Sequence, residues 1–132
     1  MKTKVYFLLL AISVFFVSCN KEPGIGGKAT IRGTVIEKHY NSIDDPAPSE
    51  YPAANKAVYI IYGDDVTYSD KLNTGPDGQF AFERLRKGSY TIYVYSDDPS
   101  FPTNPKMAVM EKVEISEKKQ DISIPDLITH KF

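Results

Sequence analysis

Acidic side chains occur as three adjacent pairs, and paired carboxylates are the first candidates for acid–base chemistry or for binding calcium. The pairs are Asp44-Asp45, Asp64-Asp65 and Asp97-Asp98. Each pair lies in or beside a segment that we expect to be a loop, where carboxylates commonly face water. None has the spacing of an EF-hand loop. We therefore interpret them as turn residues, and a hydrolase that uses loop carboxylates is the alternative.

Two histidines are the other side chains that could bind a metal or act as a base near neutral pH. His39 and His130 lie far apart in the chain, and neither belongs to an H-x-H or H-E-x-x-H motif, which are spacings typical of zinc sites. We predict no metal site, no catalytic residue and no cofactor. The chain is accordingly expected not to be an enzyme.

The amino-terminal segment has the pattern of a secretory signal. Lys2 and Lys4 precede a mostly apolar run of 13 residues, 5–17, and the small Ser18 follows it. As a helix this run would span ~20 Å, whereas the hydrocarbon core of a membrane measures ~30 Å. We therefore predict that residues 1–18 are a signal peptide that is cleaved.

The chain's one cysteine, Cys19, directly follows this signal. With the preceding Phe-Val-Ser it resembles the lipobox of bacterial lipoproteins, although Phe16 stands where leucine is usual. The resemblance implies lipidation of the Cys19 thiol and a lipid anchor in the membrane. Asn20, in place of the aspartate that retains lipoproteins at the inner membrane, favours the outer membrane of a Gram-negative bacterium. The alternative is an ordinary signal peptide, or an uncleaved anchor, with an incidental cysteine.

Charge and composition narrow the fold class and the kind of partner. The chain carries 16 basic and 17 acidic residues, and without residues 1–18 the numbers are 14 and 17. No stripe of lysine and arginine runs along the sequence, so we exclude nucleic acid as a partner. Nine prolines and eight glycines interrupt the chain at short intervals, which favours short strands. We predict a flexible tether over residues 19–28 and one all-β domain over residues 29–132.

Alternation of apolar and polar residues predicts seven strands. One strand runs through Phe80 and Phe82, and the others cover residues 29–38, 57–62, 68–74, 89–96, 107–115 and 121–127. Residues 39–56 are expected to form a long loop. The side chains predicted to face the core are Ala29, Ile31, Gly33, Val35, Val58, Ile60, Tyr62, Phe80, Phe82, Leu85, Tyr90, Ile92, Val94, Ala108, Met110, Val113, Ile122, Ile124 and Leu127.

Residues 75–78, Gly-Pro-Asp-Gly, have the chemistry of a tight turn. Pro76 has the φ needed at the second position, Asp77 suits the third, and Gly78 can adopt a positive φ. This turn predicts a hairpin between the strand at residues 68–74 and the strand through Phe80.

The order of these features is similar to that of the carboxypeptidase regulatory-like domains. The residues that carry the resemblance are Thr74, Asp77, Gly78, Phe80, Phe82, Leu85, Gly88, Tyr90, Ile92 and Val94. It covers residues 29–96 well and the last two strands in outline. The resemblance implies a seven-stranded transthyretin-like (prealbumin-like, Ig-like) β-sandwich that serves as a non-catalytic accessory module. It also implies that Tyr90 forms a tyrosine corner, whose hydroxyl bonds to the backbone.

Tyr59, Tyr93 and Tyr95 lie on predicted strands but outside the assigned core. Tyr93 and Tyr95 must face outward if their alternating neighbours face inward. In the transthyretin-like arrangement the strand at residues 57–62 lies next to theirs, which places Tyr59 beside them. One interpretation is cross-strand pairing that steadies the sheet. The other is a surface that binds a partner, either another envelope protein or a carbohydrate.

A further alternative is an adhesin-type stalk. In the B-type repeats of collagen adhesins, which are related sandwiches, a lysine on the first strand is coupled to an asparagine or aspartate on the last. Lys28 with Asp121 or Asp126 would be the corresponding pair in this chain. Lys28 lies before the apolar face of its strand, which disfavours such an isopeptide crosslink.

Overall fold

The structure, a computed structural model, describes residues 21–100 and 106–132. Within these ranges the chain forms nine strands in two sheets, and the prediction of an all-β sandwich is confirmed. No helix in the described part is long and apolar enough to cross a membrane. The predicted signal peptide and Cys19 lie outside the described residues.

The first sheet is organised around one long strand, β1 (Ile25–His39). The first half of β1 lies between β5 (Gln79–Leu85) and β8 (Asp121–Ser123), and its second half lies between β2 (Ser49–Pro52) and β9 (Leu127–Lys131). Pairing with β5 and β2 is antiparallel, whereas pairing with β8 and β9 is parallel. A single strand therefore holds four others in place.

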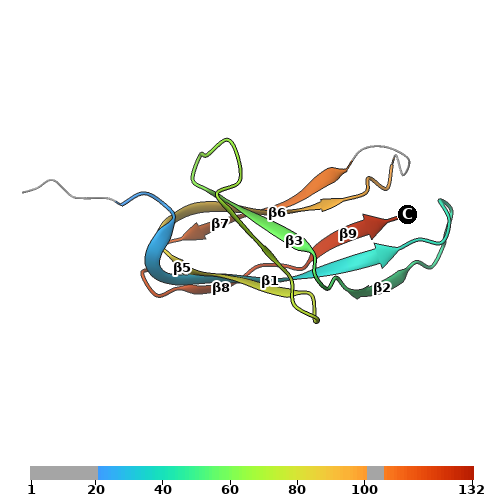
Figure 1. Cartoon of the computed structure of the whole chain (residues 1–132), viewed down its shortest axis with the longest axis horizontal. Helices are drawn as coiled ribbons and strands as arrows, with labels where there is room; N and C mark the ends of the chain where they lie inside the picture. Colours follow the sequence, from blue (N-terminus) through green and yellow to red (C-terminus); the bar gives the residue numbers. More distant parts are fainter. Residues whose placement is uncertain (1–20, 101–105) are drawn as a thin grey trace, which may run out of the picture.

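The second sheet is antiparallel, with the order β4-β3-β6-β7. Its strands are β4 (Asp70–Asn73), β3 (Ala57–Tyr62), β6 (Gly88–Ser96) and β7 (Met107–Ile115). Figure 1 shows β6 and β7 in one layer and β1, β8 and β9 in the other, with the C-terminus at the end opposite to the one where the chain enters.

The hydrophobic core lies between the two sheets. Its fully buried side chains alternate along the strands as predicted, because side chains two residues apart point to the same face. The predicted core residues that are buried are Ala29, Ile31, Val35, Val58, Ile60, Phe80, Phe82, Leu85, Tyr90, Ile92, Val94, Val113, Ile124 and Leu127. Tyr62 and Ile122 are partly buried against this cluster.

The strands differ from the prediction in three places, and two of these raise the strand count from seven to nine. Strand β2 lies within residues 39–56, which we expected to be a loop, and the expected last strand is divided into β8 and β9. Strand β1 begins at Ile25, so its first residues belong to the segment expected to be a tether. β2, β8 and β9 all pair with β1, and the first residues of β1 pair with β5. Local alternation does not report which strands pair.

The predicted inward face of β7 is wrong at Ala108 and Met110, whereas Val113 is buried as predicted. Val109 packs against the core, whereas Met110 is 57% exposed and Ala108 is half-buried. The pairing with β6 sets this register, since Val109 lies opposite the buried Val94 and Met110 lies opposite Tyr93. Apolar residues occur in both phases of this segment, so the sequence alone favours neither face.

The turn at residues 75–78 forms, but it does not make the predicted hairpin. The amide of Gly78 donates to the Gly75 carbonyl at 3.0 Å, and Gly78 has the expected positive φ of 71°. Strand β4 before the turn pairs with β3, however, while β5 after it pairs with β1. The turn therefore carries the chain from one sheet to the other.

The predicted tyrosine corner is confirmed at the end of the sandwich where the chain enters. The buried Tyr90 hydroxyl donates to the Arg86 carbonyl at 2.7 Å and accepts from the Gly24 amide at 2.8 Å. The Arg86 amide in turn donates to the Gly24 carbonyl at 2.8 Å. These bonds hold the segment before β1 against the β5–β6 turn.

Candidate functional site

The structure brings the three predicted surface tyrosines together on the outer face of the second sheet. Tyr59 on β3 lies opposite Tyr93 on β6, and their rings stack with centroids 4.9 Å apart and an interplanar angle of 11°. Tyr95 meets both rings edge-on, at 5.5 Å from Tyr59 and 5.6 Å from Tyr93. Such offset and edge-to-face pairs are the favoured arrangements of aromatic rings.

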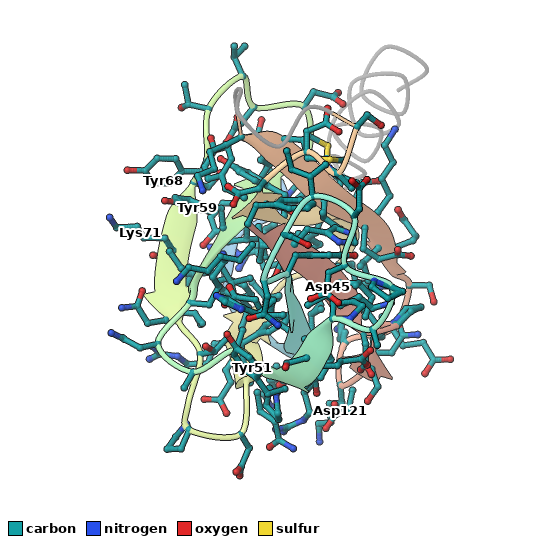
Figure 2. The ribbon with its side chains drawn as sticks, turned by 90° about the vertical axis from the view of Figure 1, so that its right-hand side faces the viewer. Asp45, Tyr51, Tyr59, Tyr68, Lys71 and Asp121 are labelled. Carbon is teal, nitrogen blue, oxygen red and sulfur yellow. The ribbon has the colours of Figure 1, made fainter. Side chains whose placement is uncertain are left out.

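A fourth tyrosine, Tyr68, extends this cluster. Its ring lies 5.1 Å from Tyr59 in an edge-on arrangement, and Figure 2 shows the two on the same side of the molecule, near Lys71. Sequence reasoning missed Tyr68 because its position depends on how the β3–β4 connection folds back along β3. We refer to Tyr59, Tyr68, Tyr93 and Tyr95 together as the tyrosine face.

The members of the tyrosine face differ sharply in exposure. Tyr93 is only 8% exposed, although its side chain points away from the core, because the neighbouring rings cover it. This burial raises the pKa of Tyr93, and the neighbouring Tyr95 raises it further. Tyr68 and Tyr95 are 46% and 44% exposed. The outer tyrosines therefore offer contact area, while Tyr93 serves as their support.

One exposed apolar side chain adjoins the tyrosine face, and another lies in the connection that leads to it. Met110 lies opposite Tyr93 on β7 and is 57% exposed, and Val66, in the connection that leads to Tyr68, is 98% exposed. Tyrosine and methionine are enriched in the contact surfaces of proteins. The outer face of this sheet thus combines packed aromatic rings with an exposed apolar side chain that is easily desolvated on binding.

The three acidic pairs do not converge on one site. Asp45 accepts hydrogen bonds from the backbone amides of Asn41 and Ala47, and these bonds lower the pKa of the Asp45 carboxyl. Asp65 accepts from the Ser69 hydroxyl at 3.0 Å, and Asp97 is paired with Lys106. These contacts stabilise turns. Within residues 21–100 and 106–132, no group of three His, Cys, Asp or Glu side chains has the geometry to bind a metal.

The two histidines point to opposite faces of the first sheet. His130 on β9 lies opposite Lys38 on β1, whereas His39, the last residue of β1, lies opposite Lys131. Because successive side chains alternate between the faces, the two imidazoles do not meet. The Nδ1 of His130 lies 3.0 Å from the Tyr40 hydroxyl. Burial lowers the pKa of His130, and the positive charge of Lys38 lowers it further.

Acidification is expected to destabilise the fold through His130. Because burial lowers its native pKa below the ordinary value of 6.5, the unfolded state binds a proton first as the pH falls. The stability contributed by neutral His130 is therefore complete above about pH 6.5 and is lost as the pH falls through the native pKa. Urea midpoints at about pH 7.5 and about pH 5 measure this loss, which should be smaller in His130→Gln. An equal fall in both proteins would contradict it.

Lys28 does not approach either aspartate proposed for an isopeptide bond closely enough to form an ion pair in the described structure. Lys28 is exposed, and the Asp121 carboxylate is instead bound to Arg32 Nε at 3.0 Å. Asp126 is also exposed. The site proposed for lipidation, Cys19, lies outside the described residues.

Comparison with known proteins adds little to this picture. No protein family matches the chain, and no curated protein matches it. The solved structure of a candidate carbohydrate binding protein from Pseudomonas aeruginosa matches with a TM-score of 0.46 and 13% identity, over 77% of this chain and 90% of that chain. The function is therefore inferred from the geometry of the tyrosine face itself.

Proposed function

We propose that the protein is a lipid-anchored accessory module of the cell envelope, non-catalytic and of the carboxypeptidase regulatory-like kind, which binds another envelope protein through its tyrosine face. The observation that carries the proposal is the exposure of Tyr68 and Tyr95, at 46% and 44%. Both pack edge-on against the stacked pair of Tyr59 and Tyr93. Aromatic residues held rigidly on a sheet supply a large contact area at a low entropic cost.

The shape of the surface favours a protein partner. Tyr59 and Tyr93 cover each other's faces, and the exposed Met110, which lies opposite Tyr93, widens the surface beyond the rings. A surface of exposed aromatic and apolar side chains suits a second protein surface. A carbohydrate is the second candidate, because the half-exposed rings of Tyr68 and Tyr95 could each stack on the apolar face of a sugar.

The remaining parts of the proposal come from the sequence. The signal pattern and the lipobox-like Cys19 support export and lipid anchoring, with the outer membrane of a Gram-negative bacterium as the expected location. The tyrosine corner at Tyr90 and the buried Phe80 and Phe82 support the carboxypeptidase regulatory-like assignment. In this arrangement the lipid holds the module at the membrane and the tyrosine face meets the partner.

The double substitution Tyr68→Ser with Tyr95→Ser tests the tyrosine face. Both side chains are half exposed, so their truncation should leave the fold intact, whereas Tyr93 is kept because it is buried. Crosslinking in cells followed by mass spectrometry measures the partners, and we expect recovery to fall roughly tenfold or more, as for loss of central interface tyrosines.

Tyr51→Ser is the matched control, because Tyr51 is 41% exposed but lies on β2 in the other sheet. Figure 2 shows Tyr51 apart from Tyr59 and Tyr68. If the double variant melts like the wild type and yields unchanged partners, the tyrosine face only steadies the sheet. The ligand is a carbohydrate if the double variant loses binding to an envelope polysaccharide but keeps its protein crosslinks.

A further inference from the structure

An open groove of about 830 Å³ lies at the end of the sandwich where the chain enters. Three segments remote in sequence line it: the residues before and at the start of β1, the β5–β6 turn, and the β7–β8 connection. Figure 1 shows this end of the molecule opposite to the C-terminus. The tyrosine corner holds the first two of these segments together.

The groove is strongly basic. Six cationic side chains line it: Lys21, Lys28, Arg86, Lys87, Lys118 and Lys119. The one acidic residue in its lining, Glu114, accepts a hydrogen bond from the Ser89 hydroxyl at 2.6 Å. Among the ion pairs of the described residues, none involves these six cations. Their charges are therefore available to an anion.

Positive charge is concentrated in the groove, although the chain after residue 18 has more acidic than basic residues. Of the 14 lysines and arginines after residue 18, six line the groove, and the other eight share the rest of the protein with 16 acidic residues. The mature chain is acidic overall, yet one end of it is positive. A surface of this kind attracts anions locally without attracting them to the whole protein.

Arg86, on the β5–β6 turn, is one of the lining cations. Its Nε is buried and has no hydrogen-bond partner among the described residues. Gly26, which has a φ of 121°, makes room for the guanidinium, since a Cβ at that position would lie 2.6 Å from Arg86 Nη2. A buried donor without a partner is costly, and an oxyanion would satisfy it.

We propose that this groove binds the phosphate groups of anionic membrane lipids and holds the entry end of the sandwich against the bilayer. The orientation rests on the proposed lipid anchor: Lys21 is two residues after Cys19, so the anchor lies within ~7 Å of chain from the groove lining. Lysine and arginine side chains near a membrane surface interact favourably with anionic headgroups. The same phosphate chemistry could be met by a free phosphate ion, and the experiment separates the two.

The test uses the chain from Asn20 onward, which contains every strand of both sheets and carries no lipid. Its binding is measured by cosedimentation with vesicles of phosphatidylcholine alone or with about one third phosphatidylglycerol. We expect binding only to the anionic vesicles, with a decline as salt screens the charges. The double substitution Lys118→Gln with Lys119→Gln should weaken it by roughly fivefold for each lysine, or roughly 25-fold in all.

Lys112→Gln with Lys131→Gln is the matched control, because it removes the same charge from exposed lysines outside the groove. The control should retain binding to within about threefold of the wild type. Equal losses in the two double variants, or no preference for anionic vesicles, would overturn the proposal. A response of groove residues to inorganic phosphate in NMR spectra without vesicle binding would also overturn it, in favour of a small-anion site. Since neither lipidation nor the tyrosine face enters this assay, its failure is distinct from failure of the proposed function.

Discussion

Truncation of Phe80 to alanine is expected to lower the free energy of unfolding by ~3–5 kcal/mol, the range for large-to-small substitutions of buried aromatic residues. Phe80 is 5% exposed and lies edge-on to Phe82, with ring centroids 6.0 Å apart. Its ring also covers Gly33 on β1, where a Cβ would lie 2.5 Å from the tip of the ring. Since a domain of this size is stabilised by only ~5–15 kcal/mol, the substitution removes a large share of its stability.

Urea unfolding followed by tyrosine fluorescence or circular dichroism measures this loss. Phe82→Ala should cost a similar amount, because Phe82 is equally buried. Glu83→Ala is the control, since Glu83 is exposed on the same strand and its truncation should change stability by less than about 0.5 kcal/mol. Losses below about 1 kcal/mol for both phenylalanines would contradict the prediction.

Replacement of Cys19 with serine is expected to release the protein from membranes. Serine lacks the thiol that would carry the lipid, and several acyl chains, each buried methylene contributing ~0.8 kcal/mol, make a lasting anchor. Membrane fractionation with a high-salt wash measures the effect, because the wash also removes protein held only by the charges of the basic groove. We expect the wild type to stay with the membrane and the variant to be soluble.

Ser18→Ala provides the control for this experiment, since it alters the same junction but keeps the cysteine and a small residue before it. This variant should remain anchored. If Cys19→Ser still fractionates with membranes after the wash, the lipobox interpretation is wrong and the apolar segment before it is the anchor.

The alternation of residues along single strands was sufficient to predict most of the core. Phe80 with Phe82, and Ile92 with Val94, are buried as expected, because a strand turns every second side chain to the same face. The tight turn ending at Gly78 also follows from its residues alone, since the turn geometry requires a positive φ there. These features depend on neighbours within a few residues, and local sequence contains that information.

The tyrosine face could be predicted only in part. Alternation placed Tyr93 and Tyr95 on one outer face, and the strand order of the family that the chain resembles placed Tyr59 beside them. Only the packing of four rings shows that Tyr93 is covered while Tyr95 is exposed. A residue's exposure on a sheet depends on the size of the side chains across the neighbouring strands, and these are fixed by pairing.

What the tertiary structure alone decided is which remote segments meet. β4 and β5 flank a well-predicted turn yet belong to different sheets, and the register of β7 follows from its pairing with β6. The basic groove is the clearest case, because Lys28, Arg86 and Lys118 come from three separate parts of an acidic chain. The sequence gives the order of the charges along the chain, whereas the electrostatic field depends on their distances in space. Only the folded arrangement of the strand ends brings these cations together at one end.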